Sequence, residues 1–330
     1  MAVSGDRPQH PGAQAGAALI TPPDDIKVEA EGCNGRMWTL AGEDQWDQGV
    51  ALADEDEGTD FDGMYDAPFT AIYNSTAFEV GARFGGIREE KYDFILAVHV
   101  MSTPQMNWRD VDSEFRLSWS AKRDSKLWVK EGDSRRCLPV RLGGKTKIKA
   151  TWNPKGEQYG LILLPLIGAY PRWMGEPLIS TFTTTTDTTE SGFEIGYVKM
   201  GNPLPEDYEI WPEWRIQAAA EGMVVELPDY SHGSDDYERA EEDALRKLIL
   251  APLLEDEHLL VRSDKMAFGG PFVSSLDTQF HQRMGGRRLC YPIPGRTPNA
   301  LYPVKVSGAP IGTKIQVQCP RPWPRPWGLE

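Results

Sequence analysis

The sequence predicts a mainly β protein with two domains. Its 330 residues are enough for about two domains at roughly 150 residues each. The chain is rich in turn-forming residues, with 32 glycines and 26 prolines, and it contains 11 tryptophans. Many segments alternate apolar and polar residues with a period of two, which is the spacing of a half-buried strand. These three observations favour short strands joined by turns over long helices.

The first domain is expected to contain the most apolar strand of the chain. Residues 94–100 carry Phe94 and Val98 on one face, together with Leu96 and Val100, while the other face is also largely apolar. A strand of this composition is typical of one buried on both sides. Two further strands are predicted over 115–119 and 147–152, with turns at Gly132-Asp133 and Gly143-Gly144.

A change in composition marks the expected domain boundary. The run Thr181–Thr189 contains mostly threonine, a β-branched residue that suits an edge strand. Residues 1–35 have few apolar residues and no periodicity at their start, which indicates a flexible arm. We therefore expect an arm over 1–35, a first β domain over 36–190 and a second over 191–330.

The second domain is also expected to be β. The alternation restarts at Phe193, Ile195 and Tyr197, and residues 302–319 form two alternating runs around a Gly-containing turn. The two runs predict a hairpin with a longer connection. A helix is expected over Asp235–Leu248, because acids at its start and Arg246-Lys247 near its end suit the helix dipole. Residues 248–250 could already belong to a strand.

Composition excludes several functional classes. Lys and Arg number 35 and Asp and Glu 49, a formal net charge of −14 that disfavours binding to nucleic acid phosphates or anionic membranes. The longest apolar stretch, 161–169, is far below the roughly 20 residues of a membrane span, and the N-terminus does not resemble an export signal. The four cysteines have no CxxC spacing and predict reduced thiols of a protein made in a cytoplasm.

Motifs for catalysis, cofactors and metals are absent from the sequence. No GxSxG or HExxH pattern occurs, and Pro139 stands where a phosphate-binding loop ending in Gly144-Lys145-Thr146 needs glycine. An acidic run from Asp54 fails as an EF-hand, because Gly58 falls where an oxygen ligand is required. No two histidines are four residues apart. We therefore expect no catalytic site, no cofactor and no metal. Paired acids leave a glycan hydrolase as a remote alternative.

The C-terminal tail carries the best candidate contact residues. Its last ten residues, from Arg321, alternate proline with Trp323, Arg325 and Trp327. Three prolines fix an extended backbone and remove three donors, so this tail is not expected in a central strand. Large aromatic side chains anchor interfaces and also stack on sugars. Three sites remain open for the tail: the chain's own domain, a neighbouring protein or a glycan. We expect both tryptophans to be at least half buried. Phe94 and Val98 complete the candidate interface.

A series of short motifs resembles the minor tail proteins of siphophages that infect actinobacteria, and in particular their distal tail (Dit-like) protein. The motifs occur in order between residues 62 and 330: Asp62–Pro68, Ile72–Ser75, Gly81–Gly86, Trp214–Ile216, Glu226–Ser231, Leu259–Asp264, Tyr291–Pro294 and Arg325–Glu330. The resemblance spans about residues 36–330 and leaves the preceding arm uncovered.

The resemblance implies a fold and a set of partners. It implies an N-terminal domain related to tail-tube proteins, a β-barrel or sandwich that forms a hexameric ring, and a galectin-like C-terminal β-sandwich. The ring would join the tail tube protein to the baseplate hub or tail-associated protein, near the tape-measure terminus and the receptor-binding proteins, in the tail tip of the virion. The alternative is a carbohydrate-binding adsorption protein that contacts the host cell wall. It would require Trp211, Trp214, Trp323 and Trp327 to line an exposed shelf.

Overall fold

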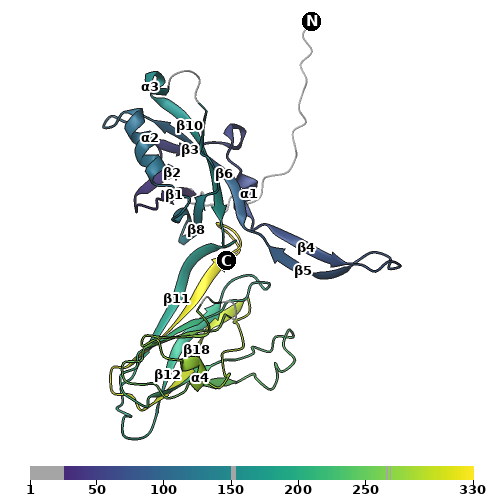
Figure 1. Cartoon of the computed structure of the whole chain (residues 1–330), viewed down its shortest axis with the longest axis vertical. Helices are drawn as coiled ribbons and strands as arrows, with labels where there is room; N and C mark the ends of the chain where they lie inside the picture. The colour runs from purple at the N-terminus through teal and green to yellow at the C-terminus, as the bar shows by residue number, and fades with distance from the viewer. Residues whose placement is uncertain (1–25, 150–153, 265–266, 268) are drawn as a thin grey trace, which may run out of the picture.

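The computed structural model describes residues 26–149, 154–264, 267 and 269–330. These residues form two β bodies stacked along the long axis of the molecule and joined at a narrow waist (Figure 1). A two-stranded arm projects sideways from the lower end of the upper, N-terminal body. All strand pairings in the described parts are antiparallel, as the following pairs illustrate: β1 with β2, β6 with β10, β11 with β19, and β12 with β18.

The N-terminal body is a strongly curved sheet with short helices around it. Its strands follow the order β2-β1-β7-β8-β10-β6-β3, with β9 also paired to β10. Their bounds are Lys27–Glu31 (β1), Met37–Ala41 (β2), Val50–Leu52 (β3), Tyr92–Met101 (β6), Ser125–Glu131 (β7), Ser134–Leu142 (β8), Lys147–Lys149 (β9) and Tyr159–Gly168 (β10). The helices are Glu55–Glu57 (η1), Phe61–Tyr65 (α1), Trp108–Leu117 (α2) and Pro154–Glu157 (α3). Among the described strands β2 and β3 do not pair, so the sheet is open and not a closed barrel.

The apolar strand expected at 94–100 is confirmed as β6. Phe94, Leu96, Val98 and Val100 are all buried, and β6 pairs along its whole length with β10. Its other face is less uniformly buried than expected, because Ile95 remains 37% exposed while Ala97 is fully buried.

The strand expected at 115–119 is wrong, because this segment ends helix α2. The Asn107 side chain caps the helix by accepting a hydrogen bond from the Asp110 backbone N–H at 3.2 Å. Val111 and Phe115, four residues apart, both face the core. Phe115 and Trp119, which suggested a strand, are also four residues apart and so fit a helix. The cap at Asn107 favours the helix over the strand.

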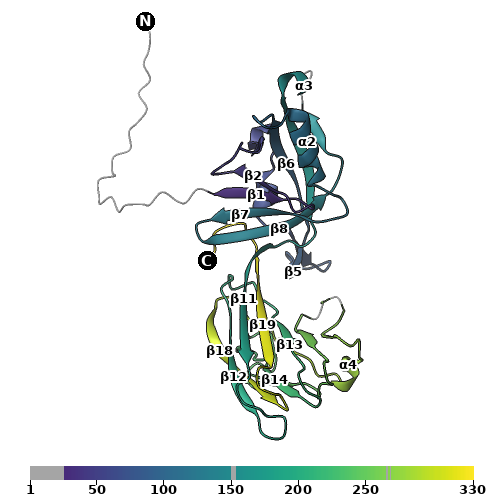
Figure 2. The same cartoon turned by 90° about the vertical axis from the view of Figure 1, so that its left-hand side faces the viewer.

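The C-terminal body is a sandwich of two sheets (Figure 2). The first sheet has the order β17-β16-β13-β19-β11, and the second has the order β12-β18-β14-β15. The bounds are Trp173–Thr183 (β11), Glu194–Asn202 (β12), Glu213–Ile216 (β13), Val224–Pro228 (β14), Lys247–Ile249 (β15), Leu259–Arg262 (β16), Phe272–Ser274 (β17), Phe280–Arg283 (α4), Thr297–Ser307 (β18) and Lys314–Trp323 (β19). The predicted C-terminal β-sandwich is therefore present.

The hairpin expected over 302–319 is wrong, although both of its strands exist. β18 pairs with β12 and β14, whereas β19 pairs with β11 and β13 in the opposite sheet. The connection between them crosses the edge of the sandwich. Thr184 and Thr188 fix this corner, because the Thr184 hydroxyl donates to Pro310 O at 2.7 Å and the Thr188 N–H to Ala309 O at 2.9 Å.

The helix expected over Asp235–Leu248 is also wrong. Residues 235–246 form successive turns, and strand β15 begins at Lys247. The segment offers little apolar surface for packing, since Leu245 is 73% exposed and Ala240 is its one buried residue. A short helix without a buried face is not stable by itself.

The chain limits of the two bodies differ from the expected boundaries. Residues 1–25 of the expected arm lie outside the described residues, but Lys27–Glu31 is strand β1, paired with both β2 and β7. β11 already pairs along its length with β19 in the C-terminal body. The chain therefore crosses the waist near residues 168–173, ahead of the threonine run.

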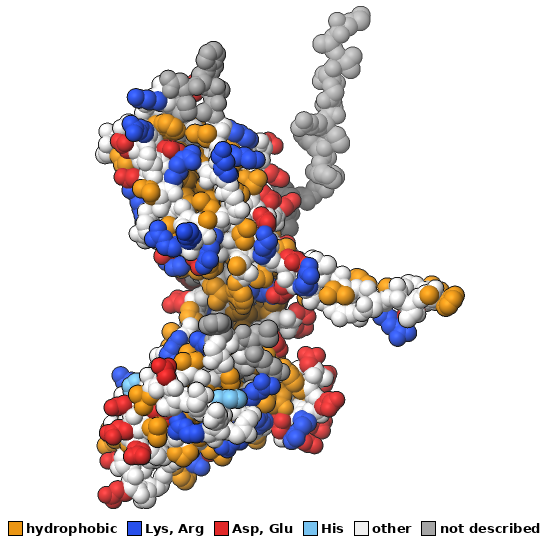
Figure 3. Space-filling view, in the orientation of Figure 1, with side chains coloured by type: hydrophobic (Ala, Val, Ile, Leu, Met, Phe, Trp, Pro, Cys, Tyr) orange, Lys and Arg blue, Asp and Glu red, His pale blue; other side chains and the backbone are white. Residues whose placement is uncertain are grey.

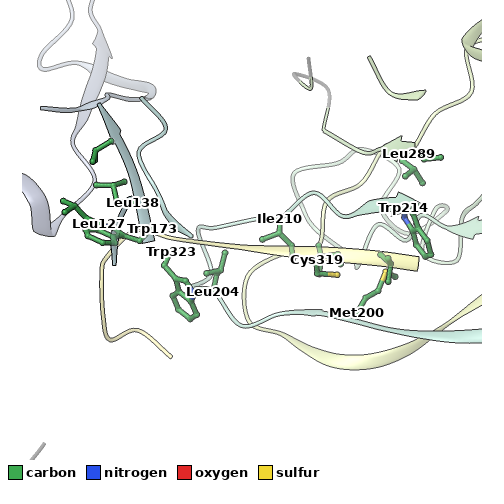
Figure 4. Close-up of a cluster of buried hydrophobic side chains, with 14 of the residues drawn as sticks. Leu127, Leu138, Trp173, Met200, Leu204, Ile210, Trp214, Leu289, Cys319 and Trp323 are labelled. Carbon is green, nitrogen blue, oxygen red and sulfur yellow. The ribbon is translucent and has the colours of Figure 1, made fainter. Parts of the chain in front are cut away.

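The two bodies share one core across the waist. β8 pairs with β11 at two positions, Met174 with Cys137 and Gly175 with Arg136, so one sheet continues from body to body. Figure 4 shows buried side chains along this path, from Leu127 and Leu138 past Trp173 and Trp323 to Trp214. The waist is therefore a packed junction rather than a linker.

Candidate functional site

The arm has one apolar and one polar face. It consists of β4 (Phe69–Asn74) and β5 (Arg83–Glu89), which pair with each other and with no other described strand. The register places Ala71 opposite Ile87 and Tyr73 opposite Phe84, on the same face as Phe69. The other face carries mainly polar side chains: Thr70, Asn74, Arg83 and Arg88, with Ile72 among them.

The apolar face of the arm is uncovered. Phe69, Tyr73, Phe84 and Ile87 are 58–65% exposed, and at the tip Phe78 and Val80 are fully exposed. Figure 3 shows hydrophobic side chains along the arm and at its tip. Isolated two-stranded hairpins are marginally stable, and a contiguous exposed apolar surface marks an interaction site.

Two ion pairs fix the base of the arm to the waist. Arg172, itself buried, pairs with Glu89 at the end of β5. Arg325 of the C-terminal tail makes a two-pronged contact with Asp66, just before β4, with Nη2 to Oδ2 at 3.2 Å. Both ends of the arm are therefore anchored, while its apolar face projects into solvent.

The C-terminal tail folds back onto the N-terminal body around a buried arginine. The Arg136 guanidinium donates to the carbonyls of Arg325 at 2.8 Å and Gly328 at 2.9 Å, and it pairs with the Glu330 carboxylate. Burial lowers the pKa of Arg136, and the Glu330 charge opposes this effect. The Tyr92 hydroxyl donates to Pro324 O at 3.1 Å, and burial raises its pKa.

The two tail tryptophans pack against other residues of the same chain, and both are at least half buried, as expected. Trp323 is 7% exposed and lies under the Arg136 guanidinium, 3.9 Å from its ring centroid. Trp327 is half-buried and meets Tyr65 edge to face, with ring centroids 4.8 Å apart. Arg321–Trp323 extends β19 by pairing with β11 alone, so the prolines avoid a central position.

The candidate interface residues therefore divide into two groups. Trp323, Arg325 and Trp327 meet at the waist, where they connect the tail to the N-terminal body. Phe94 and Val98 lie in the core of that body and offer no outer surface. That the three tail residues contact a neighbouring subunit stays a prediction. The burial of Phe94 and Val98 argues against such a contact for these two residues.

Sequence reasoning missed the arm and Arg136. The alternation of Phe69, Ala71 and Tyr73, followed by turn-forming residues and then Phe84, is a hairpin signal. This signal predicts a hairpin, but it does not show that the hairpin leaves the body. No local pattern marks Arg136, whose partners lie almost two hundred residues further along the chain.

Two kinds of site are absent from the described residues: a metal-ligand cluster and a membrane-spanning helix. No group of three or more His, Cys, Asp or Glu side chains among them is placed to hold a metal ion. No helix in the described ranges has the length and apolarity to cross a bilayer. The fold and surfaces define a class of protein: two β bodies joined by a shared sheet and core, with an exposed apolar arm of the kind found in subunits of larger assemblies.

The most informative comparison is with phage tail proteins. The chain is 27% identical over 348 aligned residues to minor tail protein Gp27 of Mycobacterium phage D29, covering 93% of this chain and 99% of that protein. Minor tail protein Gp27 of Mycobacterium phage L5 is 26% identical with the same coverage. The chain is thus homologous to minor tail proteins of mycobacteriophages. No family model matches it.

Two solved structures are similar at 9% identity. The SPP1 Dit (gp 19.1) protein, described as a paradigm of the hub adsorption apparatus in phages that infect Gram-positive bacteria, has a TM-score of 0.48 and covers 89% of this chain and 98% of its own. A chain of the phage p2 baseplate in its activated conformation has a TM-score of 0.45, with 90% and 98% coverage.

Proposed function

We propose that this protein is a structural component of the phage tail tip that assembles into a ring of six copies. Homology to minor tail proteins over nearly the whole chain supports its place in the virion tail. The observation that carries the proposal is the anchored arm with its exposed apolar face. Such a surface is stabilised when a neighbouring subunit covers it.

The ring would join the tail tube protein to the baseplate hub. The two-body construction suits this position, because one body can form the ring while the other faces the hub, the tape-measure terminus or the receptor-binding proteins. The shared core at the waist keeps the two bodies in one orientation. A net charge of −14 suits a conduit for DNA, since a negative surface does not retain a passing polyanion.

The protein acts without catalysis in this proposal. Several of its acids form structural ion pairs, as with Asp66 and Arg325 or Glu257 and Arg283. A glycan hydrolase would need two carboxylates facing each other across a bound sugar. Incubating the purified protein with host cell walls should release no soluble saccharide.

The adsorption alternative loses its main support. Trp214 is fully buried and Trp323 nearly so, while Trp211 and Trp327 are half-buried. The four tryptophans therefore do not line an exposed shelf on which a glycan could stack.

Native mass spectrometry and negative-stain electron microscopy of the purified full-length protein test the proposal. We expect six-membered rings at high concentration, and immunogold labelling of purified tails should place the protein at the tail tip. A protein that stays monomeric at all concentrations, or labelling confined to the capsid, would contradict the proposal.

A further inference from the structure

We infer that the tip of the arm of one copy docks head to tail into a surface pocket on the N-terminal body of the next copy. This inference rests on the proposed self-assembly and adds the two surfaces that meet. The partner is a second copy of this chain. The evidence comes from the shape, position and charge of the tip and of the pocket.

The tip is an apolar knob. Phe78 and Val80 expose their full side-chain surfaces beyond the last paired residues of the hairpin, Asn74 and Arg83. Glu79 lies between them and pairs with Arg83, with Oε1 to Nε at 2.6 Å. The knob therefore presents two large apolar side chains with a neutral pair of charges beside them.

The pocket is apolar and of suitable size. It has a volume of about 380 Å³, and its apolar lining comes from Ala121, Pro139, Leu142, Ile167, Ala169 and Tyr170. A volume of several hundred cubic ångströms is in the range of sites that bury a ligand. Ala169 and Tyr170 lie between β10 and β11, in the segment that enters the waist, so the pocket lies beside the waist. The arm projects from the same lower end of the N-terminal body (Figure 1).

Knob and pocket lie on different sides of the same body. The sheet order β8-β10-β6 places the pocket at the β8 side, since Arg141 and Leu142 end β8 and Ile167 lies on β10. The arm returns into β6, on the other side of β10, and Figure 1 shows it projecting away from β8. Two such surfaces form a heterologous contact, which repeats from copy to copy and closes into a ring when the rotations between successive copies add up to a full turn.

Each of the two surfaces carries one acid and one base, which pair with each other in the single subunit. Asp124 and Arg141 stand at the rim of the pocket and pair with each other, with Nη2 to Oδ2 at 3.1 Å. The tip carries the matching pair Glu79 and Arg83. Glu79 can face Arg141 while Arg83 faces Asp124, so docking leaves no unpaired charge at the contact. By contrast, a larger pocket of about 560 Å³ lies on the C-terminal body, and its lining includes the polar side chains of Arg215, His258 and Lys314.

Paired variants of the full-length protein test this contact. Phe78→Asp disables the knob, and Ala121→Arg fills the pocket. Each variant alone is expected to self-associate about thirtyfold or more weakly, as when a central aromatic anchor is lost from an interface. An equimolar mixture has one intact knob and one intact pocket, so it should form dimers of one copy of each variant that grow no further. Sedimentation velocity and native mass spectrometry distinguish these species.

Leu245→Asp is the matched control, because Leu245 is 73% exposed on the C-terminal body, away from both surfaces. It should assemble as the unmodified protein does, and circular dichroism should show all three variants folded. If the unmodified protein forms rings and Phe78→Asp and Ala121→Arg form them equally well, the docking inference is overturned while the proposed ring stands. A monomeric unmodified protein would overturn both. Mixed variants that fail to pair would show that the two surfaces do not meet.

Discussion

The C-terminal tail and the arm are both rich in aromatic and apolar residues, and they lie side by side at the waist. Their side chains differ in burial: those of the tail are covered, and those of the arm are exposed. In the tail, Trp323 and Trp327 are covered by Arg136 and Tyr65 of the same chain. In the arm, Phe78 and Val80 have no cover at all. The salt bridge between Arg325 and Asp66 joins the two segments at their bases.

This difference separates stability from assembly. The tail contributes its buried area and hydrogen bonds to the folding of one subunit. The tip of the arm contributes almost nothing to that folding, because Phe78 and Val80 are as exposed to water in the folded subunit as in the unfolded chain. The apolar surface of the arm can therefore still be buried when subunits associate, and its burial would stabilise the assembly.

Truncation of residues 324–330 is expected to have the largest effect on stability. It removes every hydrogen-bond acceptor described for the Arg136 guanidinium and leaves a buried charge with only the Trp323 ring beside it. We expect the free energy of unfolding to fall by about 3 kcal/mol or more. Chemical denaturation measures this loss. Adding Arg136→Met to the truncated chain should recover part of it, because no charge is then stranded, and a truncated chain as stable as the full one would disprove the role of the tail.

Acid should lower the stability of the C-terminal body by protonating Glu257. This residue lies far from the tail and the arm, so it provides a reference for both comparisons. Burial alone would raise the pKa of this carboxyl, but hydrogen bonds from Arg283, Thr278 and the Leu254 N–H outweigh it and lower the pKa below 4.5. A lowered pKa stabilises the fold above about pH 4.5, and this contribution is lost as the pH falls further.

The variant Glu257→Gln isolates this contribution. It should lose about 2 kcal/mol at neutral pH, since it replaces a charged acceptor of several hydrogen bonds, and the difference from the unmodified protein should shrink in acid. Thermal unfolding followed between pH 7 and 3 checks this. Because the two bodies share one core, the transition should stay single; two separate transitions would show that the waist does not couple the bodies.

Two single aromatic substitutions compare tail and arm directly. Trp327→Ala removes a half-buried ring and should cost about 1.5 kcal/mol of unfolding free energy. Phe78→Ala removes a fully exposed ring and should leave stability unchanged within about 0.5 kcal/mol. Equal losses in denaturation experiments would remove the distinction between the two segments.

Shortening the arm should have the smallest effect on stability. Replacing residues 72–86 with Asn-Gly joins Ala71 to Ile87, which already face each other, through a two-residue hairpin turn. We expect the melting temperature to change little, because the anchors Asp66 and Glu89 remain. Ring formation, measured by native mass spectrometry, should be lost. A large drop in melting temperature would mean that the arm supports the fold.

Much of the strand content follows from the sequence, because local alternation sets which residues prefer a strand. β6, β12 and β19 were predicted for this reason, and their period of two is visible in any short window. Helix α2 was missed because Phe115 and Trp119 fit both the period of two of a strand and the four-residue spacing of a helix, and Leu117, which fits only the strand, is 68% exposed. Only packing of Val111 and Phe115 on the core, with the Asn107 cap, decides between them.

The sequence by itself determined the mainly β class, the acidic charge and the extended tail, because composition, alternation and proline act over a few residues. Only the tertiary structure decided which strands pair, which aromatic side chains are covered and where Arg136 finds its acceptors. The hairpin expected over 302–319 shows the reason. β18 and β19 alternate as a hairpin would, yet they belong to opposite sheets, because strand pairing depends on contacts between residues far apart in the chain. The same dependence leaves Trp323 buried and Phe78 exposed.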